Sequence, residues 1–309
     1  MLDRLISRDN LRAAFERVRA NGGCRGADGM TVGDFAANEA VEIDRLQDRL
    51  IRRCYRPFPL LRFSVGKADS GLRMLSVPAV RDRVAQTAVY LVTREIFEAE
   101  FEDASHAYRQ GRSVRTAIHR VNDLREQGYR YLVAADIDDF FNEIPHPRLI
   151  ERLRRLDLDP YVVQLFEMWI ACEIYDGRSV RALVKGVPQG SVVSPMLANL
   201  FLDELDENLA LFGQAIVRYA DDVLVLCKSP AEAAQALEVT DYLVADLELH
   251  LNREKTLTTS FDQGFKFLGA IFVKDSVYLP FEHHRPAPVT AELPVPLDLW
   301  TYLELRGVR

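Results

Sequence analysis

The chain has 309 residues, 48% of them hydrophobic and 28% charged, which is enough apolar material to bury one large core or two smaller ones. No window approaches the roughly 18 unbroken apolar residues of a membrane span, so we expect a cytoplasmic protein with no membrane partner. The four cysteines, Cys24, Cys54, Cys172 and Cys227, are far apart and form no CxxC pair. This spacing argues against a disulfide framework and against a zinc site.

Charge is distributed unevenly along the chain. The formal net charge is −7, yet residues 1–135 carry 23 Lys and Arg against 18 Asp and Glu, a net charge of +5. Residues 136–309 carry a net charge of −12. A basic part rich in Arg suits contact with phosphates and an acidic part suits metal binding, although solvated helix faces would give the same counts.

The first half of the chain alternates between helical and strand patterns. The elements expected there are helices at residues 1–20 and 39–54, a strand, turn and strand at 61–77, helices at 80–101 and 114–127, and a strand at 131–135. The run Asn21-Gly22-Gly23 ends the first helix, because glycine is a poor helix former.

The second half of the chain continues with helices and hairpins. The elements expected there are helices at 147–156 and 160–171, a hairpin that turns at Asp176-Gly177, a long helix at 191–211, a hairpin of strands 215–219 and 223–227, a helix at 231–249, and strands at 256–260 and 266–273. Five prolines between residues 280 and 296 predict an extended tail.

Three carboxylates stand at the ends of apolar strands. Asp136 follows the strand at 131–135, and Asp221 and Asp222 occupy the bend of the hairpin after Tyr219. Carboxylates beside a core are costly unless cations or metal ions neutralise them. Two magnesium ions held by such oxygens would suit phosphoryl transfer, whereas an isolated Asp pair in a hairpin bend is more often an ordinary turn.

The order of the motifs resembles that of reverse transcriptases. The palm-like motifs are Asp136-Ile137-Asp138-Asp139-Phe140-Phe141, residues Lys185 to Pro195 around Gln189-Gly190-Ser191, Tyr219-Ala220-Asp221-Asp222, Asn252 to Thr256, and Phe267-Leu268-Gly269. The upstream motifs Ala27 to Thr31, Lys67 to Arg73, Arg81 to Gln86 and Tyr108 to Ser113 are similar to the fingers of bacterial reverse transcriptases related to group II intron enzymes.

This resemblance implies an α+β, right-hand polymerase fold with fingers and an antiparallel palm sheet packed on helices, and with a thumb that is reduced or absent. Residues 1–130 would form the fingers with parts of the palm, and 131–275 the palm with the catalytic motifs. Residues 276–309 would form a Pro-rich tail, or a truncated thumb or linker. The activity implied is RNA-directed DNA polymerisation, with an RNA template, a DNA or RNA primer and dNTPs as partners.

The resemblance also implies a role for each matching residue. Asp136, Asp221 and Asp222 would bind two Mg²⁺ ions, which Mn²⁺ can replace, and Lys255 would protonate the leaving pyrophosphate unless it is an ordinary surface lysine. The dNTP-binding residues would be Lys67, Arg73, Ile137, Phe141, Gln189 and Gly190. The primer-binding residues would be Tyr219, Phe267, Leu268 and Gly269.

Phe141 bears on the choice between DNA and RNA products. It lies five residues beyond Asp136, where the family places an aromatic ring that collides with a 2′-hydroxyl. Phe140 is an alternative for this role, since one of the two rings is expected to pack in the core. Asp138 and Asp139 are expected to be solvated.

Among short bacterial reverse transcriptases, the motifs look most like the CRISPR-associated group. That likeness implies partnership with the CRISPR adaptation integrase and the acquisition of spacers from RNA. The alternatives are retron, diversity-generating and phage-defence enzymes, and an inactive palm that acts as an RNA-binding splicing scaffold.

Overall fold

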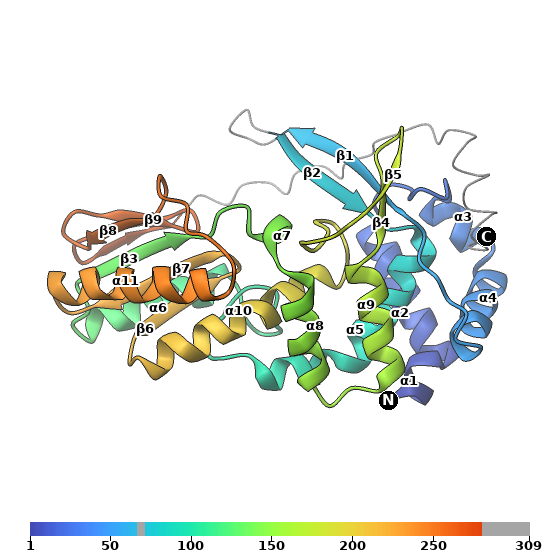
Figure 1. The fold of residues 1–309 in the computed structure, drawn as a ribbon, viewed down its shortest axis with the longest axis horizontal. Helices are drawn as coiled ribbons and strands as arrows, with labels where there is room; N and C mark the ends of the chain where they lie inside the picture. The colour runs from blue at the N-terminus through green and yellow to red at the C-terminus, as the bar shows by residue number, and fades with distance from the viewer. Residues whose placement is uncertain (67–71, 280–309) are drawn as a thin grey trace. The chain divides into compact units, whose positions relative to one another are not determined.

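The computed structural model describes residues 1–66 and 72–279 (Figure 1). These residues form two compact units, and each unit is built from two separate stretches of the chain. Within the described part, unit 1 comprises residues 1–97 and 146–194, and unit 2 comprises residues 98–145 and 195–279. No described helix combines the length and the apolar composition that a membrane span requires.

Unit 1 combines helices with a four-stranded sheet. Its helices are α1 (Leu2–Ile6), α2 (Arg8–Asn21), α3 (Val32–Ala37), α4 (Glu39–Ile51), most of α5 (Val80–Glu100), α8 (His146–Arg155) and α9 (Pro160–Ile170). Its strands are β1 (Leu60–Gly66), β2 (Leu72–Val77), β4 (Glu173–Tyr175) and β5 (Val180–Ala182). The strand order is β2-β1-β4-β5, in which only the β1–β4 pair is parallel.

Local sequence explains how these helices begin. The Ser7 side chain accepts a hydrogen bond from the backbone of Asn10 and caps α2. Thr31 and Asp34 form a reciprocal capping box at α3, which satisfies backbone N–H groups that the helix itself cannot pair.

A buried polar cluster ties α5 to α9 in unit 1. The Asp82 carboxylate accepts hydrogen bonds from the Tyr55 hydroxyl and the Phe58 backbone N–H, both at 2.8 Å. The Trp169 indole donates in turn to the Tyr55 hydroxyl at 3.1 Å. A buried carboxylate is tolerated here because its oxygens are paired.

Unit 2 is built on an antiparallel sheet. Its helices are α6 (Val114–Glu126), α7 (Phe140–Glu143), α10 (Ser194–Leu211) and α11 (Pro230–Asp246). Its strands are β3 (Tyr131–Asp136), β6 (Ala215–Tyr219), β7 (Asp222–Cys227), β8 (Leu257–Ser260), β9 (Phe265–Phe267), β10 (Ala270–Val273) and β11 (Ser276–Tyr278). The main sheet has the order β6-β7-β3-β8, and a second sheet has the order β11-β10-β9.

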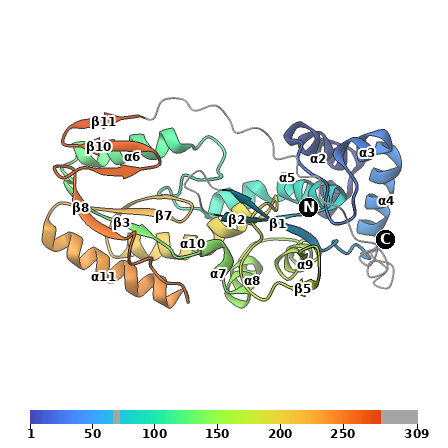
Figure 2. The same cartoon turned by 90° about the horizontal axis from the view of Figure 1, so that it is seen from above.

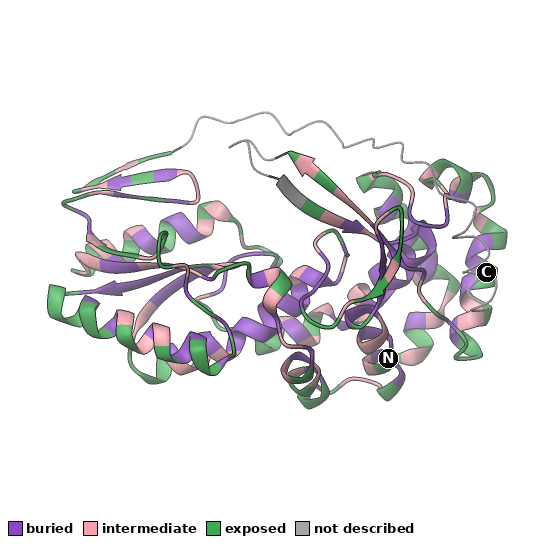
Figure 3. Cartoon of the chain, turned by 45° about the horizontal axis from the view of Figure 1, so that its top comes forward, coloured by how far each residue is buried: buried purple, intermediate pink, exposed green. Residues whose placement is uncertain are grey.

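Helices cover both faces of the main sheet. Figure 2 shows α6 on one face and α11 on the other. Leu132, Leu224 and Leu226 pack with α6 and with the β9–β10 hairpin in one apolar cluster. Side chains alternate along a strand, so Val133 and Val225 point to the opposite face. The strands of this sheet are therefore largely buried, as Figure 3 shows.

The structure confirms most of the predicted elements and corrects others. The helix expected at residues 1–20 is interrupted at Ser7, which separates α1 from α2. Residues 266–273 were expected to form a strand, but β9 ends at Phe267 and β10 begins at Ala270. Leu268 and Gly269 have φ angles of 50° and 85°, which form a tight turn instead of extended backbone. The helix expected from residue 191 begins at Ser194.

Gly26 leads to a prediction about stability. A Cβ atom at this buried position would lie 2.4 Å from the Ala79 Cα and 2.7 Å from the Ala79 backbone nitrogen. Gly26→Ala should therefore lower the free energy of unfolding by about 2–3 kcal/mol, measured by chemical denaturation. Gly33→Ala in α3, where the nearest atom lies at 3.7 Å, is the matched control and should cause no loss. Equal stabilities of the two variants would contradict this account.

Candidate active site

Strand pairing in unit 2 brings the three predicted acids together. Asp136 is the last residue of β3 and lies opposite Asp222, the first residue of β7. Tyr219 of β6 also pairs with Asp222, so Ala220 and Asp221 form the two-residue turn between β6 and β7. Ala220 has a φ of 57°, in the left-handed region that such tight turns require. Side chains at directly paired positions have Cβ atoms about 5 Å apart.

The cluster carries an excess of negative charge. Burial, followed by repulsion from Asp221 and Asp136, raises the pKa of Asp222 from 3.8 to about 6, although the residue as a whole is exposed. The Lys255 ammonium lies 3.1 Å from one Asp136 oxygen and 3.4 Å from the other. This hydrogen bond raises the pKa of Lys255, so the ammonium keeps its proton beside the acids.

The loop before β8 holds Lys255 beside Asp136. The Asn252 backbone N–H donates to the Asp136 carbonyl at 2.8 Å, which anchors the loop to the end of β3. The Asn252 side-chain oxygen accepts from the backbone N–H of Lys255 at 3.2 Å. Lys255 is therefore held beside Asp136 by hydrogen bonds of Asn252, although the two segments lie more than a hundred residues apart in the sequence.

Arg218 is a positioning residue that the sequence reasoning missed. Its side chain is fully buried and donates three hydrogen bonds of 2.5–2.9 Å to the equally buried Asp206 of α10. It also donates to the Asn199 side chain at 3.0 Å and to the Ala220 carbonyl at 3.1 Å. This guanidinium ties the turn that carries Asp221 to α10. In the sequence, the one signal for this positioning role was that Arg218 directly precedes Tyr219 of the acids' motif.

The two aromatic residues after Asp136 occupy different environments. Phe140 is 1% exposed and packs 6.5 Å from the Phe201 ring, whereas Phe141 is half-buried. Ile137 is buried beside Leu251. The backbone hydrogen bonds on either side of it are made by the Asp136 carbonyl and the Asp138 N–H, and neither involves the Ile137 carbonyl. Asp138 and Asp139 are exposed, as expected.

The remaining predicted nucleotide-binding residues belong to unit 1. The Gln189 carbonyl accepts from the Ser76 backbone N–H of β2 at 2.7 Å. Gly190 has a φ of 115°, and a Cβ there would lie 3.1 Å from the Ser76 carbonyl oxygen, so glycine is needed for close approach to β2. Lys67 lies outside the described residues, and Arg73 is described only as part of β2.

Gln86 of α5 is a second residue that the sequence reasoning left without a role. Its side-chain oxygen accepts hydrogen bonds from the Ser191 hydroxyl and from the Val192 backbone N–H, both at 3.1 Å. The Gln86 side chain is buried, so these bonds fix the loop that carries Gln189 and Gly190.

The predicted primer-binding residues share one apolar cluster in unit 2. Phe267 belongs to the core between α6 and the β9–β10 hairpin, and Tyr219 and Leu268 pack against it. Gly269 completes the turn of that hairpin. Tyr219, next to the acids, and the β9–β10 turn are about fifty residues apart in the sequence. The structure therefore brings them together.

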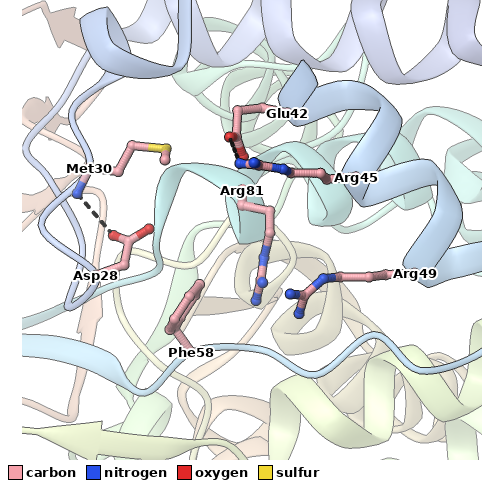
Figure 4. Close-up of a pocket in the computed structure, with 7 residues that line it drawn as sticks. All are labelled: Asp28, Met30, Glu42, Arg45, Arg49, Phe58 and Arg81. Atoms are coloured by element: carbon pink, nitrogen blue, oxygen red, sulfur yellow. Dashed lines mark hydrogen bonds and ion pairs between the residues drawn. The ribbon is translucent and has the colours of Figure 1, made fainter. Parts of the chain in front are cut away.

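Unit 1 contains a separate cavity of about 460 Å³ (Figure 4). Its walls are Asp28, Met30, Glu42, Arg45, Arg49, Phe58 and Arg81. Burial, with repulsion from Asp82, raises the pKa of Asp28 to about 7, while Arg81 and Arg83 oppose that rise. None of the predicted catalytic residues lines this cavity.

The comparison with protein families decides the identity. Residues 65–272, about two thirds of the chain, match the family described as reverse transcriptase (RNA-dependent DNA polymerase). The chain belongs to the reverse transcriptase family. The matched region includes Asp136, Asp221, Asp222 and Lys255.

Two curated relatives and one solved structure show the extent of the likeness. The chain is 31% identical to the protein YkfC of Escherichia coli K12, over 79% of this chain and 74% of YkfC. It is also 31% identical to the group II intron-encoded protein LtrA of Lactococcus lactis, over 66% of this chain but only 34% of LtrA. A Candida albicans telomerase structure has a TM-score of 0.59 at 13% identity, over 89% of this chain and 53% of that chain, which shows a shared fold.

The residues of this reverse transcriptase fit a divalent metal ion by their chemistry. Among residues 1–66 and 72–279, no three His, Cys, Asp or Glu side chains are already arranged as a metal cage. The fit rests instead on three adjacent carboxylates. Burial, and then repulsion from Asp221 and Asp136, raises the pKa of Asp222, and a hard cation would relieve that repulsion. Enzymes of the family use such ions, and oxygen ligands are those that magnesium prefers.

The raised pKa of Asp222 leads to a prediction about pH. The folded protein binds this proton more tightly than the unfolded chain, so the contribution of Asp222 to stability is lost as pH rises from about 4 to about 6 and does not change further above pH 6. In EDTA, Asp222→Asn should raise the melting temperature by a few degrees at pH 8, about 1 kcal/mol after solvent screening, and very little at pH 4.

Magnesium provides the second arm of this experiment. It should raise the melting temperature of the wild-type protein at pH 8 and have less effect on Asp222→Asn, because the variant has lost a ligand. A variant that melts below the wild-type protein in EDTA at pH 8 would contradict the raised pKa of Asp222.

Proposed function

We propose that this protein copies RNA into DNA by metal-dependent nucleotidyl transfer at Asp136, Asp221 and Asp222. The observation that carries the proposal is the β3–β7 pairing, which sets Asp136 opposite Asp222 within the matched family region. Two magnesium ions bound by these carboxylates would activate the primer 3′-hydroxyl and neutralise charge on the leaving pyrophosphate.

Other residues of the chain would transfer a proton and bind the primer, the template and the nucleotide. Lys255, which is protonated and in contact with Asp136, would give a proton to the pyrophosphate oxygen as that oxygen leaves. Tyr219 and the turn at Leu268 and Gly269 would support the primer. Gln189 and Gly190 would contact the nucleotide and template, with Lys67 and Arg73 binding the triphosphate.

For the biological role, we propose that the DNA copy serves CRISPR spacer acquisition through an adaptation integrase. The support is the sequence pattern alone, namely the intron-like upstream motifs together with Gln189-Gly190-Ser191. Co-purification of the purified chain with the integrase tests this role separately from the chemistry. A protein that synthesises DNA but shows no affinity for the integrase would leave the polymerase proposal intact and refute the partner.

Loss of the metal acids is the direct test of activity. The Asp221→Asn, Asp222→Asn double variant should extend oligo(dT) on poly(rA), with dTTP and magnesium, about a thousand-fold more slowly, because metal catalysis is worth several kcal/mol. Asp138→Asn is the matched control, since it keeps the oxygen that accepts from Asn252 and should retain near wild-type activity. Equal activity of the double variant and the control would exclude this site.

Sugar selection provides a second test. Phe141→Ala removes the half-buried ring and should reduce discrimination against ribonucleotides at least ten-fold, or about 1.4 kcal/mol, in single-nucleotide extension. Phe140→Leu alters the buried neighbour and should lower stability without admitting ribonucleotides. If only Phe140→Leu relaxes selection, the roles of the two rings are reversed.

A further inference from the structure

Unit 2 contains a cavity of about 500 Å³ at the start of β6, apart from the predicted polymerase residues. Its walls are Asp103, Ala104, His106, Arg112, Arg120, Gln214, Ala215 and Ile216. The opposite end of β6 leads into the turn that carries Asp221. β6 runs from Ala215 to Tyr219, four residue steps of extended chain or about 13 Å, before the turn at Ala220 and Asp221.

Three polar groups on the walls of this cavity have no protein partner. Within the described part of the chain, the guanidinium of the exposed Arg120 makes no hydrogen bond or ion pair, and the same holds for the side-chain amide of Gln214. His106 is only 5% exposed, and its Nε2 atom has no hydrogen-bond partner, whereas Nδ1 lies 2.9 Å from the Thr116 hydroxyl. The Nε2 atom is itself buried from solvent, so the unpaired groups that a ligand can reach are those of Arg120 and Gln214.

The charge around His106 is positive. Burial, followed by repulsion from Arg112, Arg109 and Arg120, lowers the pKa of His106 to about 4. The one acid on the cavity wall is Asp103, whose side chain is 99% exposed and is already paired with Arg112 at 2.5 Å. The cavity therefore presents donors and positive charge to whatever enters it, which is the pattern that binds an anion.

We propose that this cavity binds a backbone phosphate of a polynucleotide strand, held by Arg120 and the side-chain amide of Gln214. The proposal rests on the proposed function in taking the nucleic-acid substrate as the source of the phosphate. At about 3.4 Å of helix axis per nucleotide, the length of β6, about 13 Å, corresponds to about four nucleotides. The phosphate would thus belong to the bound strand and not to the nucleotide being added.

The experiment measures binding of an RNA–DNA primer–template by fluorescence anisotropy at several salt concentrations. Arg120→Gln should weaken binding roughly ten-fold and reduce the slope of log affinity against log salt by about 1, because one phosphate contact is lost. Gln214→Ala should weaken binding less and leave the salt slope unchanged. Arg115→Gln is the matched control, since Arg115 is exposed on the same helix and lines neither described cavity.

The outcomes separate this site from the polymerase site. The Asp221→Asn, Asp222→Asn double variant, which is expected to abolish synthesis, should show the same loss of affinity when Arg120→Gln is added. Failure of DNA synthesis therefore leaves the binding result interpretable. Equal effects of Arg120→Gln and Arg115→Gln would overturn the proposal.

A titration with inorganic phosphate at constant ionic strength tests the source of the anion. Phosphate should compete with primer–template on the wild-type protein and should compete less on Arg120→Gln. If phosphate stabilises the wild-type protein through Arg120 while primer–template affinity is unchanged in Arg120→Gln, the ligand is a free anion and a polynucleotide site is refuted.

Discussion

The register between β3 and β7 is the constraint on which the candidate active site depends. It sets Asp136 opposite Asp222, and the turn after β6 adds Asp221. Because side chains alternate along a strand, a slip of one residue would turn Asp136 to the other face of the sheet. The apolar pairing of Leu132 with Leu226 resists such a slip, since both side chains pack against α6. Hydrophobic burial thus holds three like charges together.

A buried ion pair provides the second restraint on these acids. Removing Arg218 and Asp206 from water is costly, and the cost is offset only because every contact is short and the guanidinium is also bonded to Asn199 and to the Ala220 carbonyl. The backbone of Arg218 pairs as well, with its N–H donating to the Ala104 carbonyl at 2.8 Å. The turn that carries Asp221 is therefore held from both α10 and the segment before α6.

Unit 1 positions its motif residues by the same means. The loop carrying Gln189 is fixed through Gln86 on α5 and through backbone contact with Ser76 on β2. Gly190 permits that contact because any side chain would crowd the Ser76 carbonyl. In both units, residues of the recognisable motifs are held by hydrogen bonds with polar groups on neighbouring elements.

The sequence by itself determined most of the elements, the order of the motifs and the three acids at strand ends, because apolar periodicity and turn residues are local signals. It could not show that Arg218 is buried or that Gly190 serves β2. Nor could it show that Arg120 shares a cavity with a histidine and a glutamine from other segments. Tertiary structure decided these points, since periodicity indicates which face of an element is buried but not which distant residues meet there.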